Sequence, residues 1–211
     1  MAPRRALIVV DIQQEYFSGP LEIAYPPRAE SLSNVITAIQ VADAAGLPVI
    51  AVQHSMPEEA PVFVDGTDGF DLHPEVVAAL PSATTRVTKS FGSVFAGTDV
   101  AEQLRTLEVD TVTIVGFMTN NCDLATAVEA EGLGFAAEIL SDATGAINLS
   151  NAAGTVSAEI LHTTLMTLLH SNFAAVATTE QWVDAVRSGS ALDKNNLVES
   201  AMVGTEAVAA H

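Results

Sequence analysis

The sequence has one cysteine, few basic residues and few aromatic residues. Cys122 is the single thiol among 211 residues, which excludes an intramolecular disulfide. Lysine and arginine together number 8 against 26 acidic residues, so the net charge is −18. Because such a surface repels polyanions, we expect neither nucleic acid nor anionic membrane as a partner.

Long hydrophobic runs are also missing. The apolar residues of "ALIVVDI" near the N terminus are interrupted by Asp11, too early for a membrane span or a signal peptide. A cytoplasmic location is therefore expected. Hydrophobic residues make up 49% of the chain and charged residues 16%, which indicates a compact domain that hides part of its apolar surface in a homodimer or larger homo-oligomer.

Short apolar runs alternate with helical segments along most of the chain. Strands are expected at 6–12, 47–54, 84–90, 110–117, 135–143 and 172–179. Helices are expected at 28–46, 97–109, 120–132 and 150–171. This alternation predicts an α/β fold with a largely parallel sheet. We assign residues 1–187 to one domain and 188–211 to a tail that is either mobile or an arm on a partner subunit.

Three polar residues end or follow predicted strands. Asp11 closes the first strand, Lys89 closes the strand 84–90, and Cys122 opens the helix after strand 110–117. Each alone is ordinary: a capping carboxylate, an exposed lysine, a buried thiol. In parallel α/β sheets, however, chemistry gathers at the carboxyl ends of strands. Together the three provide a nucleophile, a base and a cation, and we expect the helix start and the ammonium to favour the thiolate.

The loop after the first strand offers no phosphate-binding site. "DIQQEYFSG" lacks the glycine-rich pattern that cradles a nucleotide. No nucleotide or flavin cofactor is therefore expected.

Four sequence blocks, in order, resemble the isochorismatase-like cysteine hydrolases. They are "LIVVDIQQEYF", "VTKSFGSVFAGTDVAEQL", "VGFMTNNCDLATAVEAEGLGF" and "SDATGA". The resemblance implies a Rossmann-like, three-layer α/β/α sandwich around a six-stranded parallel sheet of order 3-2-1-4-5-6. It implies Asp11 as general base, Lys89 as the charge-stabilising residue and Cys122 as nucleophile. It also implies a cis bond between Phe117 and Met118, which aims the N–H groups of Met118 and Cys122 at an oxyanion.

The chain departs from the resemblance at two places. The residue after the nucleophile, usually apolar, is Asp123, which would raise the thiol pKa unless it points away or serves the first helical turn. Where the metal-binding branch has an Asp-x-His pair, this chain has "VQHS", with Val52 in place of the aspartate. His54 and His73 alone make a poor zinc site, so we expect no metal and no nicotinamidase activity.

The resemblance implies hydrolysis of a small amide-type C–N bond through a thioester on Cys122. Candidate substrate-binding residues are His54 and an apolar rim of Tyr16, Phe17, Phe91, Phe95 and Phe117. The aromatic residues can equally belong to the core or to a subunit interface. Two other functions stay open: an isochorismatase-type vinyl ether hydrolase, and a catalytically silent α/β binding scaffold.

Overall fold

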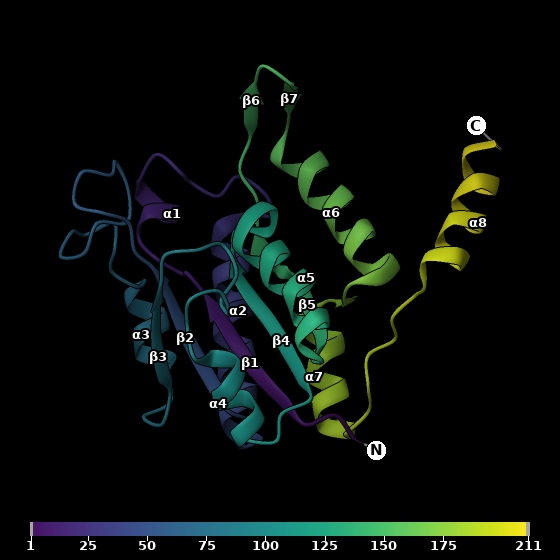
Figure 1. Ribbon diagram of the computed structural model, residues 1–211, viewed down its shortest axis with the longest axis horizontal. Helices are drawn as coiled ribbons and strands as arrows, with labels where there is room; N and C mark the ends of the chain where they lie inside the picture. Colours follow the sequence, from purple (N-terminus) through teal and green to yellow (C-terminus); the bar gives the residue numbers. More distant parts are fainter. Residues whose placement is uncertain (1, 210–211) are drawn as a thin grey trace.

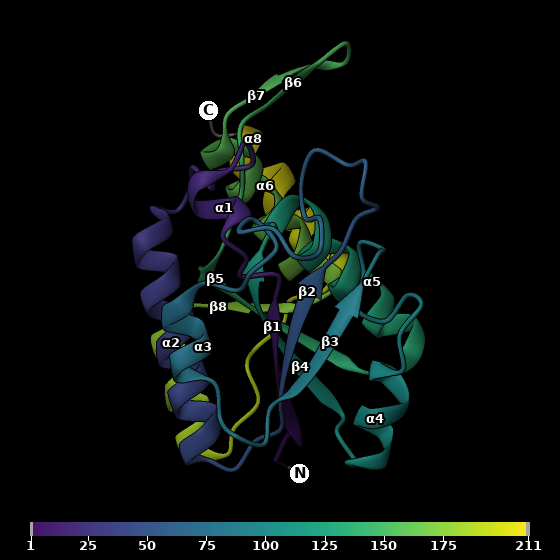
Figure 2. The same ribbon diagram turned by 90° about the vertical axis from the view of Figure 1, so that its left-hand side faces the viewer.

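A computed structural model describes residues 2–209 as a parallel sheet between two layers of helices (Figures 1 and 2). The sheet strands are β1 (Arg5–Val10), β2 (Val49–His54), β3 (Thr85–Lys89), β4 (Thr111–Phe117), β5 (Ala136–Gly145) and β8 (Ala175–Ala177). Their order is β3-β2-β1-β4-β5-β8, and every neighbouring pair is parallel. The predicted three-layer fold, and its order with β8 as the sixth strand, are confirmed.

The central strand β1 shows why the sheet lies inside the protein. All six of its residues are buried, and successive side chains enter opposite cores. Ile8 and Val10 face the layer of α4, α5 and α6, while Leu7 and Val9 face the layer of α2, α3 and α7. Because both faces are covered, the strand reads as an unbroken apolar run instead of an alternating one.

The eight α-helices are α1 (Glu15–Ser18), α2 (Arg28–Ala44), α3 (Pro74–Ala79), α4 (Val100–Thr106), α5 (Leu124–Leu133), α6 (Ala158–Asn172), α7 (Thr179–Ser188) and α8 (Leu197–Ala209). A π-helical turn, Thr119–Asp123, precedes α5. None of the helices among residues 2–209 is both long and apolar enough to cross a membrane.

The helix predicted at 150–171 begins eight residues later. Its first part forms a hairpin of β6 (Leu149–Asn151) and β7 (Gly154–Val156) that projects from the sheet (Figure 2). The Asn151 side chain accepts a hydrogen bond from the turn, and Gly154 has a φ of 149°, which excludes a helix there. The helix starts only where the Ser157 hydroxyl accepts the N–H of Ile160.

The segment assigned to the tail contains helix α8, at 197–209. Before the tail, α7, which was not predicted, packs on α2 and β5. Figure 1 shows α8 standing beside the body of the protein, next to α6.

Candidate active site

The carboxyl ends of β1, β3 and β4 bring Asp11, Lys89 and Cys122 into contact. The Lys89 ammonium lies 2.6 Å from Asp11 Oδ2 and 3.2 Å from Cys122 Sγ. All three residues are buried, at 0%, 2% and 2% exposure. Residues separated by up to 111 positions in the chain thus form one charged cluster in a largely dry environment, where electrostatic interactions are strong.

The turn after β1 fixes the orientation of Asp11. Asp11 has a φ of 48°, an unusual value for a residue with a side chain. Its N–H donates to Val52 O, and its carbonyl accepts from Gln13 N–H at 2.7 Å. The buried Gln13 amide in turn donates to His54 O and Phe70 O, and its oxygen accepts from His54 N–H. Gln13 therefore locks the Asp11 turn onto the end of β2.

The turn that leads to Cys122, called here the nucleophile turn after the role expected of that residue, depends on a glycine that no other residue can replace without strain. Gly116 has a φ of 122°, and a Cβ there would lie 2.0 Å from Val10 O. The absence of a Cβ at Gly116 lets β4 approach β1 and brings Cys122 to Asp11. The bond between Phe117 and Met118 is cis, as the resemblance implied.

Thr126 holds the same turn from the side of α5. Its hydroxyl donates to Cys122 O at 2.7 Å and accepts from Val94 N–H at 3.1 Å. The segment after Lys89 is thereby tied to the cysteine.

Lys89 has four partners. Besides Asp11 and Cys122, its ammonium donates to Phe91 O at 3.1 Å and to His54 Nδ1 at 3.1 Å. Burial and the adjacent Lys89 charge lower the pKa of His54 to about 4, so its ring is neutral and accepts this bond. Burial acts to lower the pKa of Lys89 itself, but Asp11 and Cys122 outweigh it and raise the pKa.

The ammonium occupies the position that a metal ion would need. Donor atoms of Asp11, His54 and Cys122 lie within 4.8 Å of one another, a spacing that suits a cation. Lys89 contacts all three, however, and a positive charge is already in place. This donor set therefore does not fit a metal unless the lysine moves out.

The expected thiolate is not supported by the electrostatics. Burial, followed by the negative Asp11 carboxylate, raises the pKa of Cys122, and the Lys89 ammonium only partly offsets them. Burial likewise raises the pKa of Asp11 against the opposing effect of Lys89. Burial removes the solvation that a charged thiolate needs, so it favours the neutral thiol of Cys122. The thiol lies close to a carboxylate that can accept its proton.

Asp123 does not cap the helix, contrary to the sequence-based suggestion. Its side chain makes no capping hydrogen bond, and within the described chain both carboxylate oxygens are buried without a partner. Burial and the nearby Asp11 charge raise its pKa well above the ordinary value.

The predicted aromatic rim divides into buried and exposed members. Tyr16 and Phe117 are buried with ring centroids 5.5 Å apart, and Phe17 packs on Phe117 at 5.9 Å. The ring of Phe91 is 62% exposed, although its carbonyl holds Lys89. Phe63, which sequence reasoning missed, contacts both Tyr16 and the imidazole of His54.

Phe95 lies elsewhere. Its ring stacks on Phe135 in the core beneath α4 and α5, so it does not join the aromatic group around Tyr16.

His162 is a second residue that the sequence did not reveal. It lies on α6, is buried, and its Nδ1 is 3.0 Å from the hydroxyl of Thr119 in the nucleophile turn. Burial lowers the pKa of His162, which keeps the ring neutral. A single histidine within an apolar helix carries no sequence signal for such a contact.

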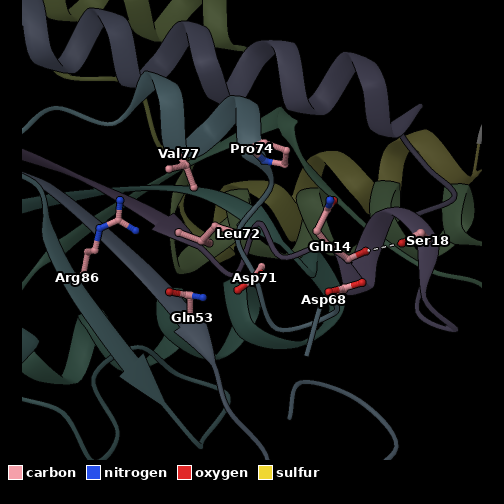
Figure 3. A pocket seen from close by; sticks show the side chains of 9 residues that line it. All are labelled: Gln14, Ser18, Gln53, Asp68, Asp71, Leu72, Pro74, Val77 and Arg86. Atoms are coloured by element: carbon pink, nitrogen blue, oxygen red, sulfur yellow. Dashed lines mark hydrogen bonds between the residues drawn. The ribbon is translucent and has the colours of Figure 1, made fainter. Parts of the chain in front are cut away.

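One cavity of the protein is separate from this cluster (Figure 3). It has a volume of about 610 Å³, and its lining includes Gln14, Gln53, Asp71 and Arg86, but not Asp11, Lys89 or Cys122. It lies on the α3 side of the sheet, where Val77 and Pro74 of that helix form one wall (Figure 3). The buried charged cluster, and not this cavity, is the candidate active site.

A parallel α/β sheet that joins a cysteine, an aspartate and a lysine at its strand ends is an arrangement of the cysteine hydrolases. The chain belongs to the isochorismatase family of hydrolases, because the family model for the isochorismatase domain matches residues 5–181. The resemblance seen in the sequence is thereby confirmed.

Three relatives show the extent of the similarity. The crystal structure of an isochorismatase-type protein from Burkholderia xenovorans is 42% identical, covers 99% of this chain and 100% of its own, and has a TM-score of 0.95. A cysteine hydrolase from Pseudomonas syringae pv. phaseolicola is 25% identical over 88% and 93% of the two chains, with a TM-score of 0.81. Nicotinamidase 3 of Arabidopsis thaliana is 29% identical over 68% of this chain and 74% of its own.

Proposed function

We propose that the protein hydrolyses a carbon–nitrogen amide-type bond of a small molecule through a thioester on Cys122. The observation that carries the proposal is the contact of Lys89 with both Asp11 and Cys122, at 2.6 and 3.2 Å, at the strand ends. These are the groups that nucleophilic acyl transfer requires: a thiol, a base next to it and a fixed positive charge.

In the first half of the reaction, Asp11 removes the proton from the Cys122 thiol as sulfur attacks the carbonyl carbon. The negative charge that develops on the carbonyl oxygen is stabilised by the N–H groups of Met118 and Cys122. When the C–N bond breaks, Asp11 returns the proton to the departing nitrogen. Ammonia or an amine leaves, and the acyl group remains on sulfur as a thioester.

In the second half, Asp11 accepts a proton from a water molecule that attacks the thioester. The C–S bond then breaks, sulfur takes the proton back from Asp11, and the carboxylic acid is released. Lys89 holds Asp11 and Cys122 in register throughout and offsets negative charge as it moves between them. His54, a neutral acceptor for Lys89, orients the ammonium.

The surroundings favour a small, flat substrate. Tyr16, Phe63 and Phe117 pack together, and His54 contacts Phe63, so apolar rings border the cluster. The similarity to nicotinamidase 3 supports an amide as the bond that is cleaved. Val52 stands where the metal-binding pattern has an aspartate, so we propose a hydrolysis that needs no metal ion. Its substrate would be a small amide, a ureido acid or an N-carbamoyl compound.

The test is ammonia release from a panel of primary amides, ureido acids and N-carbamoyl amino acids. We expect turnover by the native protein, no turnover by Cys122→Ala, and wild-type turnover by the exposed-residue control Asp43→Asn. With a slow substrate, intact-protein mass spectrometry should detect the acyl group on the native chain, and hydroxylamine should release it as a hydroxamate.

Two results would contradict the proposal. Ammonia release that persists in Cys122→Ala would exclude a thioester on Cys122 as the intermediate. Absence of turnover and of any acyl adduct across the panel would leave the silent scaffold as the better explanation.

A further inference from the structure

Helix α8 exposes a row of apolar side chains that touches almost nothing in its own chain. None of its residues 197–209 is buried, and in the described chain its element contacts are chiefly with α6. Leu197, Val198, Met202, Val203 and Val208 are 60–78% exposed. A large exposed apolar surface on a water-soluble chain indicates an interaction site.

Four of these residues share one face of the helix. At 100° per residue, Leu197, Val198, Met202 and Val208 fall within an arc of about 140°, together with Ala201. We call these five residues the arm stripe. Thr205 also falls within this arc. Glu206 and Glu199 lie about 40–60° beyond its Met202 edge, and Val203 lies on the opposite side of the helix. One face of the arm is therefore predominantly apolar and free.

The segment that leads to α8 is fixed to the body. Arg5, which is paired with buried Glu138, donates to Ser190 O at 2.7 Å. Lys194 donates to Asn172 O, at the end of α6, at 2.7 Å. Asn196 caps α8 by accepting the N–H of Glu199. The position of the arm is thus specified by contacts and not only by a flexible link.

The crystal structure from Burkholderia xenovorans supports the same conclusion. Its TM-score of 0.95 spans 99% of this chain. A coverage of 99% leaves only about 2 of the 211 residues outside the alignment, so the alignment of these two chains, which are 42% identical, includes most of the arm.

Helix α6 offers a matching surface. Ile160 is 62% exposed and Leu168 is 44% exposed. Both lie on the side of α6 opposite His162 and Leu169, which face the interior. We propose that two copies of the chain exchange arms, so that the arm stripe of each copy packs on the Ile160–Leu168 face of α6 in the other.

The area that the contact would bury favours a second copy as the occupant, and charge limits which faces can meet. A large apolar side chain loses roughly 60–120 Å² on burial, so four from each arm and the surfaces that they cover give roughly 1,000–2,000 Å², the size of a stable interface. Two copies that each carry a charge of −18 repel one another. The contact must therefore form through uncharged faces, and the arm stripe and the α6 face are such faces.

The experiment compares Val198→Glu with Val203→Glu by sedimentation velocity at about 20 μM. Both valines are exposed residues of the same helix, but only Val198 belongs to the arm stripe. We expect the native protein and Val203→Glu to sediment as a dimer, or a larger assembly of dimers, and Val198→Glu to shift to monomer with an unchanged far-UV circular dichroism spectrum. A monomeric native protein, or dimers in both variants, would overturn the proposal.

A disulfide test distinguishes exchange of arms between two copies from packing of the arm on α6 of its own chain. The double variant Met202→Cys/Leu168→Cys, oxidised with copper phenanthroline, should give covalently linked dimers when arms are exchanged. An intramolecular bond within a monomer would show that the arm packs on its own α6, and absence of either bond would exclude α6 as the docking surface. Cys122 is buried and is the only native thiol, so background cross-linking is small.

Discussion

Replacement of Lys89 by methionine tests the buried charged cluster directly. The methionine side chain has a similar length and removes only the ammonium. Asp11 would then be a fully buried carboxylate without a counter-ion, and Cys122 and His54 would each lose the donor that now lies 3.1–3.2 Å away. Removal of one partner from a buried ion pair costs about 3–5 kcal/mol. In a chain of this size that corresponds to a fall in Tm of roughly 6–20 °C.

The penalty should depend on pH with a defined sign. Burial already raises the pKa of Asp11, and loss of the ammonium removes the main opposing effect. A carboxyl with a raised folded-state pKa binds more protons in the folded than in the unfolded chain, so its cost is absent below the unfolded pKa of about 3.9 and grows as the pH rises toward the folded pKa. Lys89→Met should therefore differ least from wild type near pH 4 and most near pH 7–8.

Urea unfolding followed by the fluorescence of the buried and only tryptophan, Trp182, measures this penalty. The double variant Asp11→Asn/Lys89→Met, which leaves no unpaired charge, should recover to within about 1 kcal/mol of wild type and thus be about 2–4 kcal/mol more stable than Lys89→Met alone. All variants should lack activity, which separates stability from catalysis. A penalty below about 1 kcal/mol at pH 7, or one that does not vary with pH, would refute the description of this pair as buried and coupled.

Three further predictions follow from the same region. Asp123→Leu removes two buried oxygens without partners, so it should stabilise the protein by about 1–3 kcal/mol at pH 7 and by less at pH 4. The midpoints of urea unfolding measure this difference, and equal stability of the variant and the wild type would contradict the burial of the two oxygens. Gly116→Ala should cost about 3 kcal/mol or prevent folding, whereas Gly132→Ala, which has no neighbour within 4 Å of its new Cβ, should be neutral or slightly stabilising in the same assay. Because the folded-state pKa of His54 is about 4, the wild type should lose stability as the pH falls from about 6.5 toward 4, and His54→Gln should lack this loss. If the two proteins show parallel profiles of stability against pH, the lowered pKa of His54 is excluded.

The fold was predictable in part because three of the sheet strands carry a strong local signal. β1, β2 and β4 are runs of β-branched and aliphatic residues covered on both faces, whereas the signals of the other three strands are weaker. The order of the strands was implied by the resemblance to the family. The region before α6 was not predictable in the same way. Its apolar residues fit a helical spacing, and only the turn at Asn151 and Gly154 converts it to a hairpin.

The three members of the cluster could be anticipated because strand ends meet at one edge of a parallel sheet. The contacts around them could not. His54 bonds to Lys89 across two strands, and His162 reaches Thr119 from a helix more than forty residues away. Such pairings depend on side-chain directions that become defined only once the layers are packed, and sequence periodicity contains no information about them.

The raised pKa of Cys122 has a consequence for the proposed mechanism. If sulfur and Asp11 were both ionised at rest, the cluster would hold two negative charges against one ammonium, and only the ammonium could supply a proton to the departing nitrogen. Burial and Asp11 instead favour the protonated sulfur, although Lys89 lies 3.2 Å from it. One proton is then shared within the cluster and can move to Asp11 only when sulfur begins to form a bond. The environment that makes the thiol a poor free nucleophile thus retains the proton that the leaving group requires. We therefore expect Cys122 to react slowly with iodoacetamide at pH 7 yet rapidly with the carbonyl of a bound substrate.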